Sequence, residues 1–108
     1  MVAVFMMLLF TLTLGQEGNI VKFQGMVMEL NIKQNSMVAS EKQVMWNTNT
    51  AIYNEKGSPS SFDKLKVKSW VYLEGVDDKV TKKIVASKIY LLPKYINAKE
   101  KSLYPFMQ

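Results

Sequence analysis

Apolar and polar residues alternate along most of the chain after residue 16. A period of two with many β-branched and aromatic residues is typical of strands that bury one face. We expect strands over residues 20–33, 37–40, 43–47, 51–53, 69–75 and 80–92. The pattern therefore predicts an all-β domain of five or six strands.

Polar, turn-forming residues separate the expected strands. Turns are expected at residues 34–36, 41–42 and 76–79, and the sequence NEKGSPSS over residues 54–61 predicts one longer loop. Residues 62–65 are too few for a full helix and predict a single helical turn.

Gly25 lies inside the longest expected strand. A glycine within a strand typically marks a bulge or a sharp bend. A long bent first strand lets a small barrel share that strand between two sheets. We therefore expect the sheet to close on itself, which also removes exposed strand edges.

Charged residues decide which face of a strand points inward. Val71 and Leu73 are expected inside, because the opposite choice would bury Glu74 without a partner. The same alternation puts Trp70 and Tyr72 outside. The residues expected in the core on this basis are Gly25, Val27, Val44, Trp46, Val71 and Leu73.

The first part of the chain differs from the rest. Residues 2–14 contain no charge, and Gly15 and Gln16 then begin a polar composition that continues to the end. Thirteen uncharged, mostly apolar residues are too few to span a bilayer, but they match the hydrophobic region of a signal peptide. We expect a signal peptide over residues 1–15 and an exported, periplasmic or extracellular domain. The alternative is a buried first strand or helix of the domain.

The mature chain then divides into two parts. Residues 16–93 are expected to form the β-barrel domain, and Pro93 ends its last strand. The tail over residues 94–108 either docks on the barrel as a short helix or stays mobile, as chain ends commonly do. No further apolar run in the mature chain is long enough for a transmembrane span.

The chain has 108 residues and contains neither histidine nor cysteine. This composition excludes disulfides, the usual zinc sites, and serine–histidine or cysteine–histidine catalysis. Ser58, Ser60 and Ser61 have no evident base to activate them. We therefore expect a protein without enzymatic activity and without a cofactor.

All 14 basic residues are lysines, and the formal net charge is +5. This charge attracts anionic partners. In an exported protein these would be an anionic polysaccharide, a cell-envelope polymer or another envelope protein. Nucleic acid is disfavoured because its readout depends heavily on arginine. The alternative is that the lysines only solvate strand faces and guard edges.

The stretch from Gly25 to Leu92 carries a set of spaced residues that resembles a known family. The set comprises Gly25, Val27, Val44, Thr50 and Ile52, followed by SFDKLKVKSWVYLEGV at residues 61–76 and VASKI at residues 85–89. It resembles exported bacterial domains of unknown function that have an oligonucleotide/oligosaccharide-binding (OB) type of barrel.

The resemblance implies a small five-stranded OB-like Greek-key barrel, with Ile89 and Leu91 facing its interior. It implies no biochemical activity. This family usually has glycine where the present chain has Lys68, so we expect a turn at this position that tolerates a side chain.

The outward-facing aromatic residues suggest a binding surface. Trp70, Tyr72 and Tyr90 are expected on the outer face of adjacent strands, with Lys88 beside them. Aromatic rings stack on sugars or bases, and lysine supplies charge. We therefore predict Trp70, Tyr72, Lys88 and Tyr90 as binding residues of a small binding or assembly module. The alternative is that the tail covers these rings through Tyr104 and Phe106.

Methionine pairs give a second candidate function. Met26 and Met28 lie at alternate positions of the first strand, and thioethers suit Cu(I) or Ag(I). The barrel is similar in outline to periplasmic copper and silver chaperones, which use methionines, a histidine and a tryptophan. A periplasmic soft-metal binding protein is therefore the alternative, although methionines more often fill apolar space.

Overall fold

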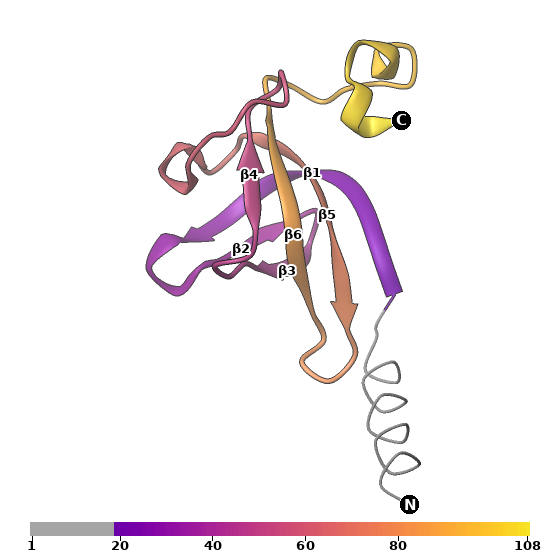
Figure 1. Cartoon of the computed structure of the whole chain (residues 1–108). Helices are drawn as coiled ribbons and strands as arrows, with labels where there is room; N and C mark the ends of the chain where they lie inside the picture. Colours follow the sequence, from indigo (N-terminus) through magenta and orange to yellow (C-terminus); the bar gives the residue numbers. More distant parts are fainter. Residues whose placement is uncertain (1–18) are drawn as a thin grey trace, which may run out of the picture.

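The computed structural model describes residues 19–108, so the predicted signal peptide over residues 1–15 lies outside the described residues. Figure 1 shows the arrangement of the strands. The strands are β1 (Asn19–Asn31), β2 (Ser36–Ala39), β3 (Lys42–Met45), β4 (Ala51–Tyr53), β5 (Trp70–Asp78) and β6 (Lys83–Leu92). Within residues 19–108 the only helices are 3₁₀ turns, at Ile32–Gln34, Phe62–Lys64, Lys101–Leu103 and Pro105–Met107. The prediction of an all-β fold is confirmed.

The six strands form one sheet in the order β3-β2-β1-β5-β6-β4. A parallel pairing of β3 with β6 joins the sheet back to itself, so β1, β2, β3, β6 and β5 form a closed ring. The strand β4 also pairs with β6 in parallel, further along that strand. The ring is compatible with the small barrel that the sequence predicted.

The interior of the ring holds the main hydrophobic core. Val27, Val71, Leu73 and Ile89 are fully buried there, and Trp46 stacks on Phe62 with its ring centroid 5.1 Å away. Val27, Val71, Leu73 and Trp46 confirm the inward faces predicted from alternation, and Ile89 lies inside as the resemblance implied. The alternation of apolar and polar residues is enough to assign each side chain to the inner or outer face, because neighbouring side chains of a strand point to opposite sides.

A bulge in β6 keeps the core continuous. Glu74 pairs with Lys88 and Gly75 pairs with Ala86, so Ser87 has no partner in β5. The extra residue shifts the alternation by one, which lets Ala86 and Ile89 both face the interior. Lys88 and Tyr90 consequently lie on the outer face.

Gly25 has a different role from the predicted one. The irregularity in β1 lies between Val27 and Glu29, not at Gly25. A Cβ atom at Gly25 would lie 2.7 Å from the Cβ atom of Ser40, which is closer than packed side chains allow. Gly25 is therefore required by the close approach of β1 to the end of β2.

Two turns are displaced from their predicted positions. The β2–β3 turn is centred on Ser40 and Glu41, both with positive φ, as tight hairpins require. The β5–β6 turn begins after Asp78 because the Asp78 carboxylate accepts a hydrogen bond from the Val80 backbone N–H at 2.8 Å. The prediction of a turn at residues 76–79 is therefore wrong, since β5 continues through Asp78.

Lys68 lies in the turn before β5 and has a φ of 72°. This is the left-handed region that favours glycine, the residue that the resembling family usually has there. The turn therefore holds the lysine backbone in a conformation that costs on the order of 1 kcal/mol for a residue with a side chain. The turn does accommodate a side chain at this position, in a backbone conformation that glycine would adopt without this cost.

Candidate functional site

The four predicted binding residues lie on the outer face of β5 and β6. Tyr72 and Tyr90 are direct cross-strand partners, and Lys88 is paired with Glu74 two residues further along the strands. Trp70 lies at the start of β5 on the same face. The structure therefore brings Trp70, Tyr72, Lys88 and Tyr90 together as alternation predicts.

The C-terminal tail covers the two tyrosines. Phe106 stacks on Tyr90 with ring centroids 3.9 Å apart and planes 3° apart, and it lies 5.9 Å from the ring of Tyr72. Tyr72 and Tyr90 are each only 7% exposed. The expectation of an open aromatic face is wrong at these positions, and the alternative of a covering tail is confirmed. A binding role for the four residues stays a prediction.

Gln24 fixes the tail to the barrel. Its side-chain nitrogen Nε2 donates to the Ile96 carbonyl at 2.7 Å, and the Ile96 N–H donates to its Oε1 at 2.9 Å. Ile96 itself is fully buried. Sequence reasoning missed Gln24 because its partner lies 72 positions away and no local pattern connects them.

A second, smaller apolar cluster forms between the tail and the outer face. Its buried members are Tyr72, Tyr90, Leu92, Ile96 and Met107. Tyr53 stacks on Tyr90 at 4.9 Å, and Trp70 meets the ring of Tyr95 at 5.2 Å. The aromatic residues of this face therefore pack against one another and against the tail.

Burial also changes the acidity of the covered tyrosines. Burial raises the pKa of Tyr72 and of Tyr90 above its usual value of 10.0, and the nearby carboxylate of Glu74 raises each further. Both causes favour the neutral phenol over the phenolate. Burial of the two rings therefore extends the pH range over which they stay neutral.

We expect removal of the covering ring to reverse this shift. In Phe106→Ala the pKa values of Tyr72 and Tyr90 should fall towards the ordinary value, because water regains access to both hydroxyls. In the intact protein, the raised pKa values contribute stability that is complete below about pH 10 and is lost as the pH rises above it. Titration by ultraviolet absorbance, with unfolding measured on both sides of pH 10, checks both statements. Identical titration curves in the variant and the intact protein would contradict them.

The methionines of the alternative function lie on β1. Met28 is 53% exposed and Met26 is half-buried opposite Trp70. Within residues 19–108, no three acidic, cysteine or histidine residues gather closely enough to hold a metal ion. That finding concerns other ligand types, so Cu(I) binding by Met26 and Met28 stays a prediction.

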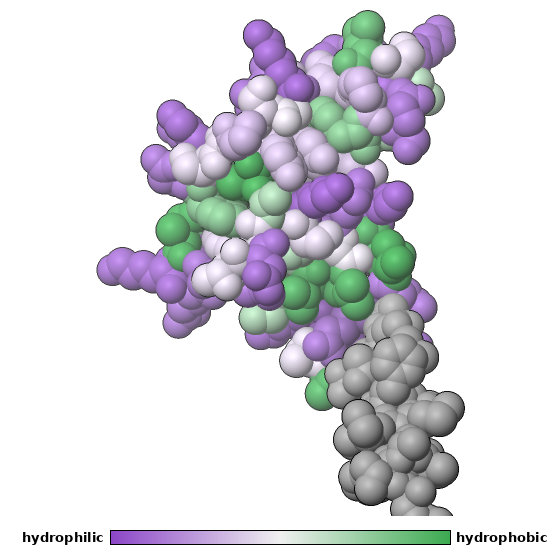
Figure 2. All heavy atoms as spheres, viewed as in Figure 1, coloured by the Kyte–Doolittle hydropathy of each residue, from purple (hydrophilic) through white to green (hydrophobic). Residues whose placement is uncertain are grey.

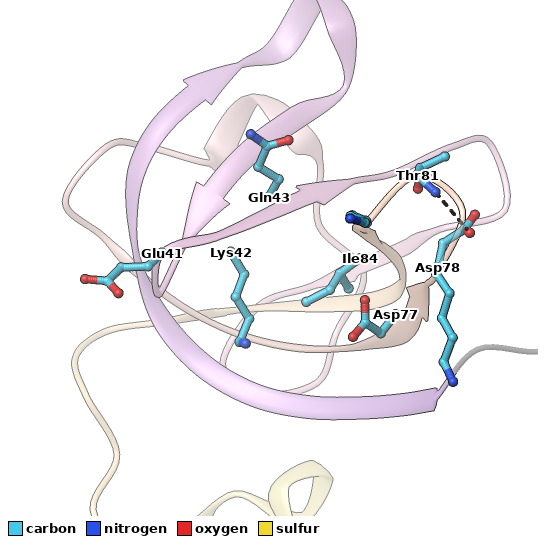
Figure 3. Close-up of a pocket in the computed structure, with 9 residues that line it drawn as sticks. Glu41, Lys42, Gln43, Asp77, Asp78, Thr81 and Ile84 are labelled. Atoms are coloured by element: carbon cyan, nitrogen blue, oxygen red, sulfur yellow. Dashed lines mark hydrogen bonds between the residues drawn. The ribbon is translucent and has the colours of Figure 1, made fainter.

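A solvent-open hollow that sequence reasoning missed lies at one end of the ring. It has a volume of about 760 Å³ and lies between the β2–β3 turn and the β5–β6 hairpin (Figure 3). Its lining residues are Glu41, Lys42, Gln43, Asp77, Asp78, Lys79, Thr81, Lys82 and Ile84. A second hollow of about 360 Å³ lies along β1, β2 and β3. No residue pattern signals either hollow, because each depends on how distant strands meet.

Apolar side chains are also exposed near the large hollow. Val80, at the tip of the β5–β6 hairpin, is 91% exposed, and Ile20, at the start of β1, is 76% exposed. Figure 2 shows apolar side chains on this side of the molecule, interrupted by hydrophilic ones. Ile20 is paired with Val76, which is exposed as well.

In the described part of the chain, none of the helices has the length and apolar character that crossing a bilayer requires.

Comparisons with known proteins identify a similar fold. No protein-family model matches the chain, and no curated protein matches it. The crystal structure of PilY2, a fimbrial biogenesis protein from Pseudomonas aeruginosa, is similar, with a TM-score of 0.52 and 17% sequence identity. The match covers 81% of the present chain and 99% of PilY2. At this identity the likeness shows a shared fold.

Proposed function

We propose that the chain is an exported, non-enzymatic binding or assembly module built on an OB-like Greek-key barrel, and that its partner is another envelope protein. The ring of five strands supports the OB-like assignment, because OB folds are five-stranded Greek-key barrels. The name of the similar structure, a fimbrial biogenesis protein, describes a role of the same kind.

The position of the large hollow carries the proposal. OB folds bind their ligands on the face of strands 2 and 3 and on the loops that join strands 1 to 2 and 4 to 5. In this chain β5 and β6 are the fourth and fifth strands of the ring, and their connecting turn lines the hollow together with the β2–β3 turn. The hollow therefore includes the loop between the fourth and fifth strands, which is one of the two loops through which OB folds bind their ligands.

The chemistry of the hollow favours a protein partner. Its lining includes no aromatic side chain on which a sugar ring could stack. It carries three acidic residues and three lysines, so it offers no uniformly positive surface to an anionic polymer. The charged residues are Glu41, Asp77, Asp78, Lys42, Lys79 and Lys82. Interspersed charges of both signs suit a polar protein surface with complementary charges.

Site-specific photo-crosslinking in cells tests the proposal. A photo-reactive residue in place of Thr81, on the hollow, is expected to give one discrete crosslinked protein. The same residue in place of Lys56, in the loop after β4, serves as the control and is expected to give none. Changing Lys42 and Lys82 together to glutamate is expected to weaken the Thr81 crosslink about tenfold, by reversing charge at the contact.

Two outcomes would contradict the proposal. Equal crosslinking from Thr81 and Lys56 would mean that the hollow has no special role. Retention of the mature domain on dextran sulfate that weakens steeply with salt, without a Thr81 crosslink, would make an anionic polymer the ligand instead.

A further inference from the structure

The first half of β1 has a strand edge that is unpaired within residues 19–108. Over Asn19–Met26 the strand β1 pairs with β5 on one side. On its other side β2 pairs only with residues Val27–Asn31 of β1. Figure 1 shows β1 bending away from β2 and running down beside β5 towards its first residue. Among the residues that the structure describes, no strand pairs with the side of β1 opposite to β5 over residues 20–24.

Hydrogen bonds at the bend show which backbone groups point to this edge. The Val27 N–H donates to Ser69 and its carbonyl accepts from Lys68, so Val27 bonds on the β5 side. The Met26 carbonyl accepts from the Ser40 N–H and so points to the opposite side. Because successive residues of a strand alternate between its two edges, the even-numbered residues Ile20, Lys22 and Gln24 direct their N–H and C=O groups to the open edge.

The open edge lies between the two elements that line the large hollow. At one end Asn19 is paired with Asp77, which lines the hollow. At the other end Gly25 approaches Ser40, whose neighbour Glu41 also lines it. In Figure 3 the first half of β1 runs along one side of the hollow, with the β2–β3 turn near one end of it and the β5–β6 hairpin near the other. An added strand on this edge would therefore lie at the hollow.

We infer that the edge of β1 over residues 20–24 binds an extended segment of another protein as an added strand. This inference rests on the proposed function, and it names the form in which the partner binds. The edge presents three N–H and three C=O groups, spaced two residues apart along the strand. The backbone of another extended chain has donors and acceptors at the same spacing and can pair with all of them. The edge covers five residues, or about 17 Å, which is an ordinary strand length.

The side chains on the edge define the partner further. Val21 and Phe23 point inward, pack against the main core and are only partly buried, so apolar residues at alternate positions of the added strand would complete their burial. Lys22 points outward and is exposed. An acidic residue directly across from Lys22 would pair with it, as opposite charges do on neighbouring strands.

The same charges argue against a second copy of the chain as the occupant. An antiparallel pairing of two β1 edges centred on Lys22 would place Lys22 against Lys22, and like charges directly opposite are destabilising. The formal net charge of +5 on each chain adds repulsion. An acidic or neutral segment of another protein avoids both the repulsion between the two lysines and the repulsion between two positively charged chains.

Amide hydrogen exchange in the full domain tests whether the edge is open. The amides of Ile20, Lys22 and Gln24 are expected to exchange at least about tenfold faster than those of Val21 and Phe23, because only the odd-numbered residues bond to β5. Equal protection of odd and even residues would show that the edge is already paired and would overturn the inference.

Peptide binding tests the partner chemistry. The probe is a synthetic seven-residue peptide that alternates valine and threonine, with a central glutamate. We expect it to slow exchange at the even-numbered amides of β1 and to bind Lys22→Pro at least about tenfold more weakly than Lys22→Ala. Proline removes an N–H that points to the open edge and leaves the β5 bonds intact, whereas alanine keeps that N–H. Equal binding by the two variants would overturn the inference.

Crosslinking separates failure of the inference from failure of the proposed function. If Lys22→Pro keeps the Thr81 crosslink to the partner at full strength, the proposed function stands and the added strand is wrong. If no partner crosslinks at Thr81 in the unchanged chain, the proposed function itself fails. If sedimentation shows that the unchanged chain is a dimer and that Lys22→Pro is a monomer, the strand added at this edge belongs to a second copy of the chain and not to another protein.

Discussion

Leu73→Ala is expected to lower the free energy of unfolding by about 2–5 kcal/mol, because it removes a fully buried side chain from the centre of the ring. Leu73 lies in β5, which pairs with both β1 and β6, so little backbone movement is available to fill the cavity. Urea denaturation followed by tryptophan fluorescence measures the change, since Trp46 lies in the same core.

Val76→Ala is the matched control for this variant. Val76 lies three residues further along β5 on the outer face and is exposed, so its truncation is expected to change the free energy of unfolding by less than about 0.5 kcal/mol. Equal destabilisation by the two substitutions would contradict the assignment of inner and outer faces. A stability loss in Leu73→Ala below about 1 kcal/mol would mean that the ring interior is not the main core.

The faces of the strands followed from the sequence because they depend on local order alone. Two residues of separation place Val71 and Leu73 on one side, and the cost of burying Glu74 selects which side is inner. Trp46 was assigned to the core by the same reasoning, and its stacking on Phe62 agrees. A period of two therefore gave most of the core without any knowledge of strand pairing.

Features that depend on side-chain contacts or on contacts between distant residues could not be predicted from the alternation of apolar and polar residues. The β5–β6 turn follows Asp78 because that side chain caps the turn, whereas composition alone placed the turn three residues too early. Gly25 is explained by Ser40, and no property of β1 itself indicates that contact. The large hollow arises between two segments, residues 41–43 and 77–84, that are at least 34 positions apart and that the sequence pattern does not relate.

The candidate site shows the same division between local and distant information. Alternation placed Trp70, Tyr72, Lys88 and Tyr90 on one outer face, and the structure agrees. Their exposure depended on the tail, whose last turn brings Phe106 onto Tyr90. The sequence could raise a covering tail only as an alternative, because no helical or strand pattern in residues 94–108 fixes where they dock.

Ile96→Ala is expected to release the tail and to remove about 2–5 kcal/mol of the free energy that holds it on the barrel. Ile96 is fully buried between the tail and the outer face, and its backbone makes two hydrogen bonds with the Gln24 side chain, donating one and accepting the other. Limited digestion by a lysine-specific protease measures the release. Lys99 and Lys101 are exposed but lie in the folded tail, whose backbone fits a protease active site only after the tail undocks. We expect cleavage there at least about tenfold faster than in the unchanged chain.

Leu103→Ala provides the control within the same tail. Leu103 is 74% exposed, so its loss removes almost no buried area and should leave the cleavage rate within about twofold of the unchanged chain. The released tail should also uncover Tyr72 and Tyr90, so their pKa values should fall in Ile96→Ala and stay raised in Leu103→Ala. If both variants are cleaved at the same rate, the buried contact of Ile96 does not hold the tail. If Ile96→Ala is cleaved faster but both tyrosines keep their raised pKa values, the stack of Phe106 on Tyr90 keeps the last turn docked by itself, and the aromatic face stays closed without the Gln24 contact.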